Sequence, residues 1–491
     1  MIFRINTHSS RASKLFDVDA GAAGGGVEYR RVPHGLSAFL NFGMNPLGKL
    51  FSAWLSLIVL CGLISPAMSQ AVDAGSSSSQ ASNAPLKPYL GPSFTGVDTT
   101  TLDNKVMAGY QGWFNAEGDG AGLGWTHWSR NKSERFGPGN VTVDLWPDVS
   151  EYDEEELYET GFHFDDGSTA RVFSSHNRKT VVRHFEWMKD YGIDGVFVQR
   201  FANGLKDKAK RHHKDVVLSH AREGANRNGR TYAVMYDLSG LPTGGTKVVK
   251  GDWKLLREKM RITEDPAYLH HKGKPVVTVW GIGFMDAGKP RKYTLAECKK
   301  LVEFLKEDGC TVMLGVPTGW RMLDRDCMPD PMMHEIIQMA DIVSPWTPGR
   351  YRDLKGVTRH GETYWAPDNQ WCDERELDYL PVIFPGFSWH NLKGAELAAI
   401  PRLKGQFLWS QMAAAKRAGS SMIYIAMFDE VDEGTAIFKC SNTPPLGDGT
   451  RFLDYEGLPS DFYLQLAGHA GKLLRGEIPL RDQIPESVKN Y

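Results

Sequence analysis

The chain has 491 residues, of which 41% are hydrophobic and 24% are charged, so it carries enough apolar material for a large globular core. Its 57 basic and 59 acidic side chains nearly cancel, and the formal net charge of −2 argues against a nucleic-acid partner. The composition is that of an ordinary globular protein.

The segment at residues 44–71 has the features of an export signal. Lys49 precedes a nearly uncharged apolar run from Leu50 to Ile64, and small residues between 67 and 71 offer cleavage sites. The run is short for a stable membrane helix. We therefore expect a secreted or periplasmic protein, which would contact a membrane only if this signal stayed uncleaved.

The other N-terminal residues fall into two segments. Residues 1–43 are rich in glycine and show no hydrophobic period, and we interpret them as a non-native or disordered extension that precedes a natural start at Met44. Residues 72–88 are rich in Ser and Ala and are typical of a flexible linker. We expect residues 89–491 to form one folded domain.

Within this domain, short apolar runs with many β-branched and aromatic residues alternate with helical patterns, which indicates βα units around a parallel sheet. The predicted strands lie within residues 106–114, 195–201, 231–239, 275–281, 311–320, 341–346, 379–389 and 421–430. Eight such strands predict a single (β/α)8 barrel of the TIM type, with a long first βα loop at 115–178.

Helical patterns between the runs support the same fold. Residues 178–192, 215–229, 295–309 and 402–419 each end in a glycine, the residue that most often follows a helix. The alternative is an open doubly wound sheet, which normally carries a glycine-rich phosphate loop. Neither GxGxxG nor GxxxxGK[ST] occurs in the sequence, so the closed barrel is favoured.

Cysteine and histidine spacing gives no sign of a metal site. Of the six cysteines, Cys61 lies in the predicted signal, and the other five allow at most two disulfides. The pairs His212-His213 and His270-His271 lie in basic, helical stretches, where we expect them to face solvent. The sequence therefore predicts no metal and no cofactor.

In TIM-type barrels the active site lies at the carboxyl ends of the strands. Many residues at these positions are aromatic, and flat aromatic faces can stack on sugar rings or simply pack in the core. Asp237 is as well suited to a structural role as to binding. The candidate carbohydrate-binding residues are Tyr110, Trp113, Trp125, His127, Trp128, Arg200, Tyr236, Asp237, Trp280, Trp320, Trp346, Trp389, His390 and Asp429.

The eighth run ends in the acidic segment FDEVDEGT, in which Glu430 and Glu433 are three residues apart. Hydrolysis of a glycosidic bond needs two carboxyl groups around the bond. In a helical turn or a tight loop both side chains can face one ligand, and two acids held close together raise one pKa. We predict that these two glutamates are catalytic; a solvated acidic loop is the alternative.

Three segments, GYQGWF at 109–114, WTHW at 125–128 and FDEVDEGTAI at 428–437, resemble the glycoside hydrolase family 71/99-like group. This group is related to the family 99 endo-α-mannosidases and endo-α-mannanases. In family 99 the last segment reads approximately EWHEGTQIEP, so both glutamates and Gly434-Thr435 match. Val431 and Asp432 stand where that family has Trp and His.

The resemblance implies a retaining glycosidase in which the substrate's own 2-hydroxyl acts as the nucleophile. Glu430 would take the proton of that hydroxyl, and Glu433 would be the general acid and then the general base. It leaves an endo-α-mannosidase-like and a xylosidase/arabinosidase-like activity open. A non-catalytic carbohydrate-binding surface protein on the same barrel is the second hypothesis, since a fold alone does not decide function.

Overall fold

The structure is a computed structural model that describes residues 84–489. The predicted extension, the predicted signal and all but the last residues of the predicted linker lie outside the described residues. Those last residues begin with a 3-10 turn, η1 (Ala84–Leu86), in which Leu86 is buried. No helix within residues 84–489 combines the length and apolar character needed to cross a membrane.

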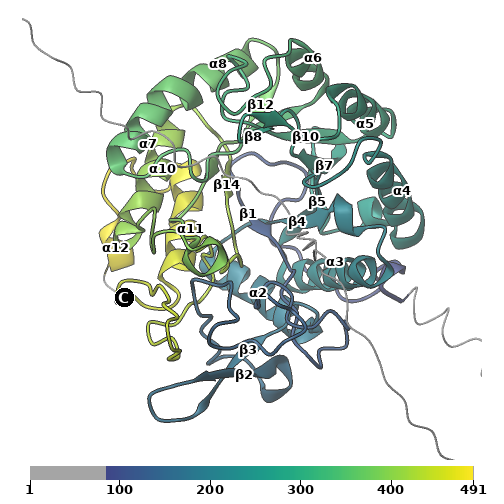
Figure 1. Ribbon diagram of the computed structural model, residues 1–491. Helices are drawn as coiled ribbons and strands as arrows, with labels where there is room; N and C mark the ends of the chain where they lie inside the picture. Colours follow the sequence, from purple (N-terminus) through teal and green to yellow (C-terminus); the bar gives the residue numbers. More distant parts are fainter. Residues whose placement is uncertain (1–83, 490–491) are drawn as a thin grey trace, which may run out of the picture. The chain divides into compact units, whose positions relative to one another are not determined.

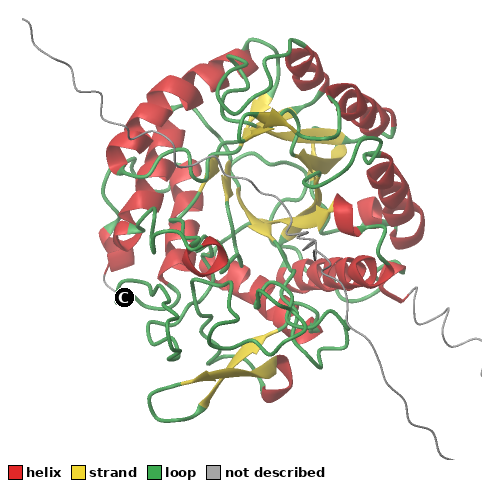
Figure 2. Ribbon diagram, viewed as in Figure 1, coloured by secondary structure: helices red, strands yellow, loops and turns green. Residues whose placement is uncertain are grey.

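The strands form a parallel ring with the helices outside it (Figures 1 and 2). Their order around the ring is β12-β11-β10-β7-β5-β4-β1-β14-β13. The strands are β1 (Val106–Tyr110), β4 (Gly195–Phe201), β5 (Thr231–Asp237), β7 (Lys274–Trp280), β10 (Thr311–Val316), β11 (Ile342–Pro345), β12 (Asp378–Tyr379), β13 (Val382–Ile383) and β14 (Ile423–Ile425).

The ring closes through an interrupted seventh strand. Its first half, β12, pairs with β11, and its second half, β13, pairs with β14. Between the halves, Leu380 N donates to Val343 O at 2.9 Å and Pro381 O accepts from Tyr424 N at 3.1 Å. With β12 and β13 counted as one position, the predicted (β/α)8 barrel is confirmed, and every predicted run supplies one strand in the expected order.

The helices occupy the predicted places between the strands. The Asn177 side chain accepts from Lys179 N at the start of α2, and Gly192 ends it with φ 77°. Thr294 and Glu297 form a capping box at the start of α5. The main helices are α2 (Arg178–Tyr191), α3 (Lys208–Asn228), α4 (Lys247–Leu255), α5 (Leu295–Glu307), α6 (Met332–Met339), α7 (Leu354–His360), α8 (Ala366–Asp373), α10 (Gln406–Arg417) and α11 (Phe462–Leu474).

Shorter elements complete the fold. Two π-helical turns extend α4 and α7, and short helices lie after β13 and at the C-terminal end of the described chain. These elements are η4 (Leu256–Met260), η6 (Gly361–Trp365), α9 (His390–Lys393) and α12 (Glu486–Lys489). The small hairpins outside the ring are β2 (Leu157–His163) with β3 (Thr169–Phe173) and β8 (Met285–Asp286) with β9 (Lys289–Pro290), while β6 (His270–His271) pairs with β7.

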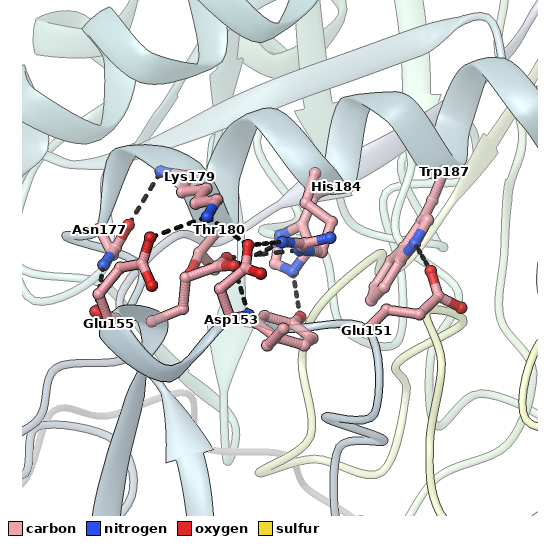
Figure 3. A network of polar contacts seen from close by, with 11 residues as sticks. Glu151, Asp153, Glu155, Asn177, Lys179, Thr180, His184 and Trp187 are labelled. Carbon is pink, nitrogen blue, oxygen red and sulfur yellow. Dashed lines mark hydrogen bonds and ion pairs between the residues drawn. The ribbon is translucent and has the colours of Figure 1, made fainter.

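The long first connection, between β1 and α2, is held against α2 by a polar network (Figure 3). Lys179 forms ion pairs with Asp153 and Glu155, and Trp187 Nε1 donates to Glu151 Oε2 at 2.8 Å. Behind them, His184 bonds to the hydroxyls of Tyr110 and Tyr152 at 2.9 and 2.8 Å. The connection is therefore fixed to the barrel through both β1 and α2.

All five described cysteines are buried free thiols, which is within the limit of at most two disulfides that the sequence set. The expectation that the paired histidines face solvent is corrected, because His213 and His271 are buried. His213 Nε2 lies 3.0 Å from Gly112 O, and His271 Nε2 lies 2.9 Å from Asp378 Oδ2, which satisfies the rings inside the protein.

Candidate active site

The chain after β14 forms a tight loop at the carboxyl end of the barrel. Thr435 N and Ala436 N both donate to Glu430 O, at 3.1 and 3.0 Å, so the loop closes on itself. Glu433 O accepts from Ser388 N at 2.9 Å, which ties the loop to the chain after the seventh strand. Gly434 has φ 63°, and a Cβ there would lie 3.1 Å from Ser388 N, so this close approach favours glycine.

Asp429 joins this loop to the end of the first strand. Its two carboxylate oxygens accept from Gln111 N and Gly112 N, both at 2.8 Å. The side chain is fully buried, and burial raises its pKa to about 7 despite these two hydrogen bonds. Both oxygens are thus held by the backbone, and Asp429 aligns the last loop with the end of β1.

Glu430 is held from two sides. Gln111 Nε2 donates to Oε1 at 2.7 Å, and Thr435 Oγ1 donates to Oε2 at 2.8 Å. The residue is 4% exposed. Burial raises its pKa well above the usual range, and the charge of Glu433 adds to that rise. The loop thus presents a fixed carboxyl group that resists ionisation while its neighbour is charged.

Glu433 is only half-buried. Burial, and after it the charge of Asp432, raise its pKa to about 8, although the indole of Trp389 and the ammonium of Lys393 act in the opposite direction. The prediction that close packing of the two glutamates raises a pKa therefore agrees with the structure. Two neighbouring acids of this kind titrate as a pair.

His127 reaches the same loop from the first connection. Its Nδ1 lies 2.9 Å from Asp432 Oδ2, and its ring stacks on Trp113 at 3.8 Å between centroids, with an interplanar angle of 5°. Two segments that the sequence keeps far apart, WTHW and FDEVDEGT, therefore meet at one place.

Several predicted aromatic residues surround the carboxyl end of the barrel. Trp113, Trp346 and Trp389 are half-buried, and Trp280 meets Trp346 edge-on at 5.3 Å. Arg291 stacks over Trp280, with its guanidinium carbon 4.9 Å from the ring centroid. Asp237 is 7% exposed, accepts from Ser239 N at 2.6 Å, and contributes to the raised pKa of Glu433.

The structure does not bring all of the predicted binding residues to this surface. Arg200 is fully buried and bonds to Asp252 at 2.7 and 2.9 Å and to Asp215 at 2.8 Å, and the Tyr236 hydroxyl also donates to Asp252. In a strand, alternate residues face opposite sides, and these two side chains point outward to α3 and α4. The predicted binding residues that lie in the core are Tyr110, Trp125, Trp128, Arg200, Tyr236, Trp280 and Trp320.

His390 is held by contacts with neighbouring loops of the protein. Its N–H donates to Asp144 Oδ2 at 2.7 Å, and its Nδ1 lies 2.8 Å from Ala395 O. Conversely, sequence reasoning assigned no role to Gln111, Asp432, Thr435, Arg291 or Lys393. The first three lie inside the motifs GYQGWF and FDEVDEGT, at the ends of the first and last predicted strands, whereas nothing in the sequence distinguishes Arg291 or Lys393.

Among the described residues, no group of three His, Cys, Asp or Glu side chains could hold a metal ion.

Comparison with known proteins supports the architecture. No protein-family profile matches the chain. The solved structure of the GH99 endo-alpha-mannosidase from Bacteroides thetaiotaomicron has a TM-score of 0.55 at 15% identity, over 77% of this chain and 99% of that chain. A structure of the same enzyme in complex with bis-tris propane gives the same TM-score and identity, over 77% and 98% of the two chains. The chain shares the barrel fold of this glycoside hydrolase.

Proposed function

We propose that the chain is a glycoside hydrolase that cleaves glycosidic bonds in a poly- or oligosaccharide, with Glu430 and Glu433 as its two carboxyl groups. The observation that carries the proposal is the pair itself. Both glutamates lie in one tight loop at the carboxyl end of a TIM-type barrel, and the pKa of each is raised by burial and by negative neighbours. General acid catalysis near neutral pH requires such a raised pKa.

Hydrogen bonds and exposure distinguish the two glutamates. Both oxygens of Glu430 accept from donors, Gln111 and Thr435, and the hydrogen bond from Thr435 opposes, without reversing, the rise in pKa that burial and the charge of Glu433 cause. Glu433 is the more exposed of the two, so its carboxyl group is more accessible to a substrate. The sequence resemblance assigns protonation of the leaving group to Glu433 and removal of a proton from the substrate to Glu430.

Unsatisfied polar atoms around the pair fit a polyhydroxylated ligand. Within residues 84–489, Gln111 Oε1 and Asp432 Oδ1 are buried acceptors without a hydrogen-bond partner, and the indole N–H groups of Trp113 and Trp280 are buried donors without one. A sugar hydroxyl both donates and accepts, so it can satisfy either kind. The half-buried rings of Trp113, Trp346 and Trp389 offer apolar surface to the sugar ring.

The finer assignment rests on the sequence resemblance and on the fold. We propose a retaining reaction through the substrate's 2-hydroxyl, with an α-mannan as the first substrate to test, since the protein with the shared fold is named an endo-alpha-mannosidase. Xylan and arabinan come next. Export through residues 44–71 remains part of the proposal, because such substrates lie outside the cell.

The test is hydrolysis by the purified protein of α-mannan, xylan and arabinan, followed by the release of reducing ends, with the double variant Glu430→Gln/Glu433→Gln as the blank. We expect one substrate to be cleaved by the wild type alone. Binding of a glycan with no cleavage by either protein would instead support the non-catalytic carbohydrate-binding hypothesis.

A further inference from the structure

His127 and Asp432 form a second ionisable pair beside the two glutamates. They are 305 residues apart in the chain, and His127 Nδ1 lies 2.9 Å from Asp432 Oδ2. The Asp432 side chain is 5% exposed and the His127 side chain 35% exposed. The imidazole is therefore the member of the pair that faces solvent, and the carboxylate is the member that faces the protein interior.

Asp432 has little else to neutralise its charge. Its Oδ1 is buried and has no hydrogen-bond partner among the described residues. A buried carboxylate with one unpaired oxygen keeps a strong field around it. That field acts on the catalytic pair, because the charge of Asp432 is among the causes, after burial, that raise the pKa of both Glu430 and Glu433.

The imidazole is fixed in its place. One face of His127 lies on Trp113, Phe114 meets the ring edge-on at 6.1 Å, and Thr142 Oγ1 donates to the His127 carbonyl at 2.5 Å. A ring packed in this way stays against Asp432 whether it is charged or neutral. Protonation of His127 therefore changes the net charge of the His127–Asp432 pair without a rearrangement of the loop.

The other charged groups around the site come from several elements. His213 of α3 faces His127, and burial lowers the pKa of His213 to about 3, so its ring is neutral. Lys393 of α9 and Asp237 of β5 face Glu433. Asp429 faces Glu430 and is held by backbone N–H groups. In this set, His127 is the imidazole that reaches solvent.

We propose that His127, acting through Asp432, is a positioning residue that decides how readily the glutamate pair gives up its proton. With a protonated imidazole the His127–Asp432 pair has no net charge, and the glutamates release a proton more easily. With a neutral imidazole the charge of Asp432 is uncompensated, and the glutamates hold the proton. The effect of this control on catalysis rests on the proposed function. The electrostatic coupling between the His127–Asp432 pair and the two glutamates does not.

The test is an infrared titration of protonated carboxyl groups, which needs no substrate. The bands are assigned with Glu430→Gln and Glu433→Gln and then followed in the wild type, Asp432→Asn, His127→Gln and the double variant. We expect Asp432→Asn to move the midpoints of the pair to lower pH by about one unit, the size expected for removal of a neighbouring charge. We expect His127→Gln to move the more acidic midpoint to higher pH, because the opposing imidazolium is gone.

The double variant is the decisive comparison. Without Asp432 nothing holds a charge on the imidazole, so we expect His127→Gln to have no added effect in the Asp432→Asn background. His163→Gln, at an exposed position on β2, is the matched control and should leave every midpoint unchanged. If His127→Gln does not fold, the NMR titration of the His127 ring in the folded Asp432→Asn protein replaces it, and that titration should move to lower pH.

The outcomes separate the two proposals. Unchanged midpoints in His127→Gln, or an unchanged His127 titration in Asp432→Asn, overturn this inference even if the protein cleaves glycans. The expected movements in a protein that cleaves no glycan support the coupling and count against the proposed function.

Discussion

Gln111 and Glu430 join the first and the last strand of the barrel at the site, through a hydrogen bond of 2.7 Å from Nε2 to Oε1. The backbone N–H of Gln111 also holds the neighbouring Asp429. Gln111, in the connection after the first strand, therefore sets the positions of Asp429 and Glu430, two adjacent acids after the last strand.

We expect Gln111→Leu to lower kcat/KM by about 10- to 100-fold, because it removes a hydrogen bond to a charged group worth about 1.5–3 kcal/mol. The backbone bond to Asp429 remains, so near-UV circular dichroism should be unchanged. Gln338→Leu, which removes a surface bond from Gln338 Nε2 to His334 O, is the control and should keep full activity. A wild-type rate in Gln111→Leu would show that Glu430 needs no such support.

We expect Glu430→Gln and Glu433→Gln each to reduce hydrolysis by about 100- to 10,000-fold while the fold stays intact, because an amide cannot exchange the proton that either role requires. Glu433→Gln should regain activity on a substrate with a strongly acidic leaving group, and Glu430→Gln should not. The hydrolysis rates of the wild type and the variants are compared on both types of substrate, provided that the wild type cleaves them. The control is Glu186→Gln, at an exposed position on α2. Equal loss on both substrate types would contradict the assigned division of roles.

The raised pKa of Glu433 also predicts how stability depends on pH. Its pKa is about 8 in the folded protein against an ordinary value of 4.5, so the folded state binds the proton more tightly. This contribution favours folding below the unfolded pKa and is lost as the pH rises through the folded pKa. We expect Tm to fall as the pH rises from about 4.5 to about 8, and we expect this fall to be smaller in Glu433→Gln. A Tm that rises over the same interval in the wild type, and equally in the variant, would contradict the shift.

The buried ion pairs of Arg200 predict a stability effect away from the site. Arg200→Met leaves Asp215 and Asp252 without their common partner, and loss of one member of a buried ion pair costs about 3–5 kcal/mol. Urea unfolding followed by circular dichroism measures this loss. The control is Arg417→Met, which removes an exposed pair with Asp482 and should change the free energy of unfolding by about 1 kcal/mol or less.

The barrel, and the place of the two glutamates directly after its last strand, were predictable because each strand is an apolar run and because the acids follow the last run directly. The direction of individual side chains was harder. Gln199 and Arg200 are adjacent at the end of β4, yet Gln199 Nε2 donates across the barrel to the Tyr424 hydroxyl at 3.0 Å, while Arg200 points outward. A position at the end of a strand does not say which side the residue faces until the register is known.

Contacts between connections that are distant in the chain could not be predicted from the sequence, for a second reason. The pairs His127–Asp432 and Gln111–Glu430 exist only after the ring has closed, so no local pattern encodes them. Similarly, the space for Trp280 depends on Gly315 of the neighbouring strand, where a Cβ would lie 2.3 Å from the ring. A glycine in an apolar run gives no hint of the side chain beside it.

The break in the seventh strand leaves the barrel with shorter strand pairings at this place than elsewhere in the ring. Pro381 has no N–H to donate, and the ring is kept shut there by two short pairings, β11 with β12 and β13 with β14, and by the bonds from Leu380 N to Val343 O and from Tyr424 N to Pro381 O. Regions held by few backbone hydrogen bonds open locally at the lowest cost in free energy. The joint at Pro381 lies on the stretch of chain that leads to Trp389 and Lys393, whereas Gln111 and His127 lie in the connection after β1. The two sides of the site are therefore attached to parts of the ring that differ in the length of their strand pairings.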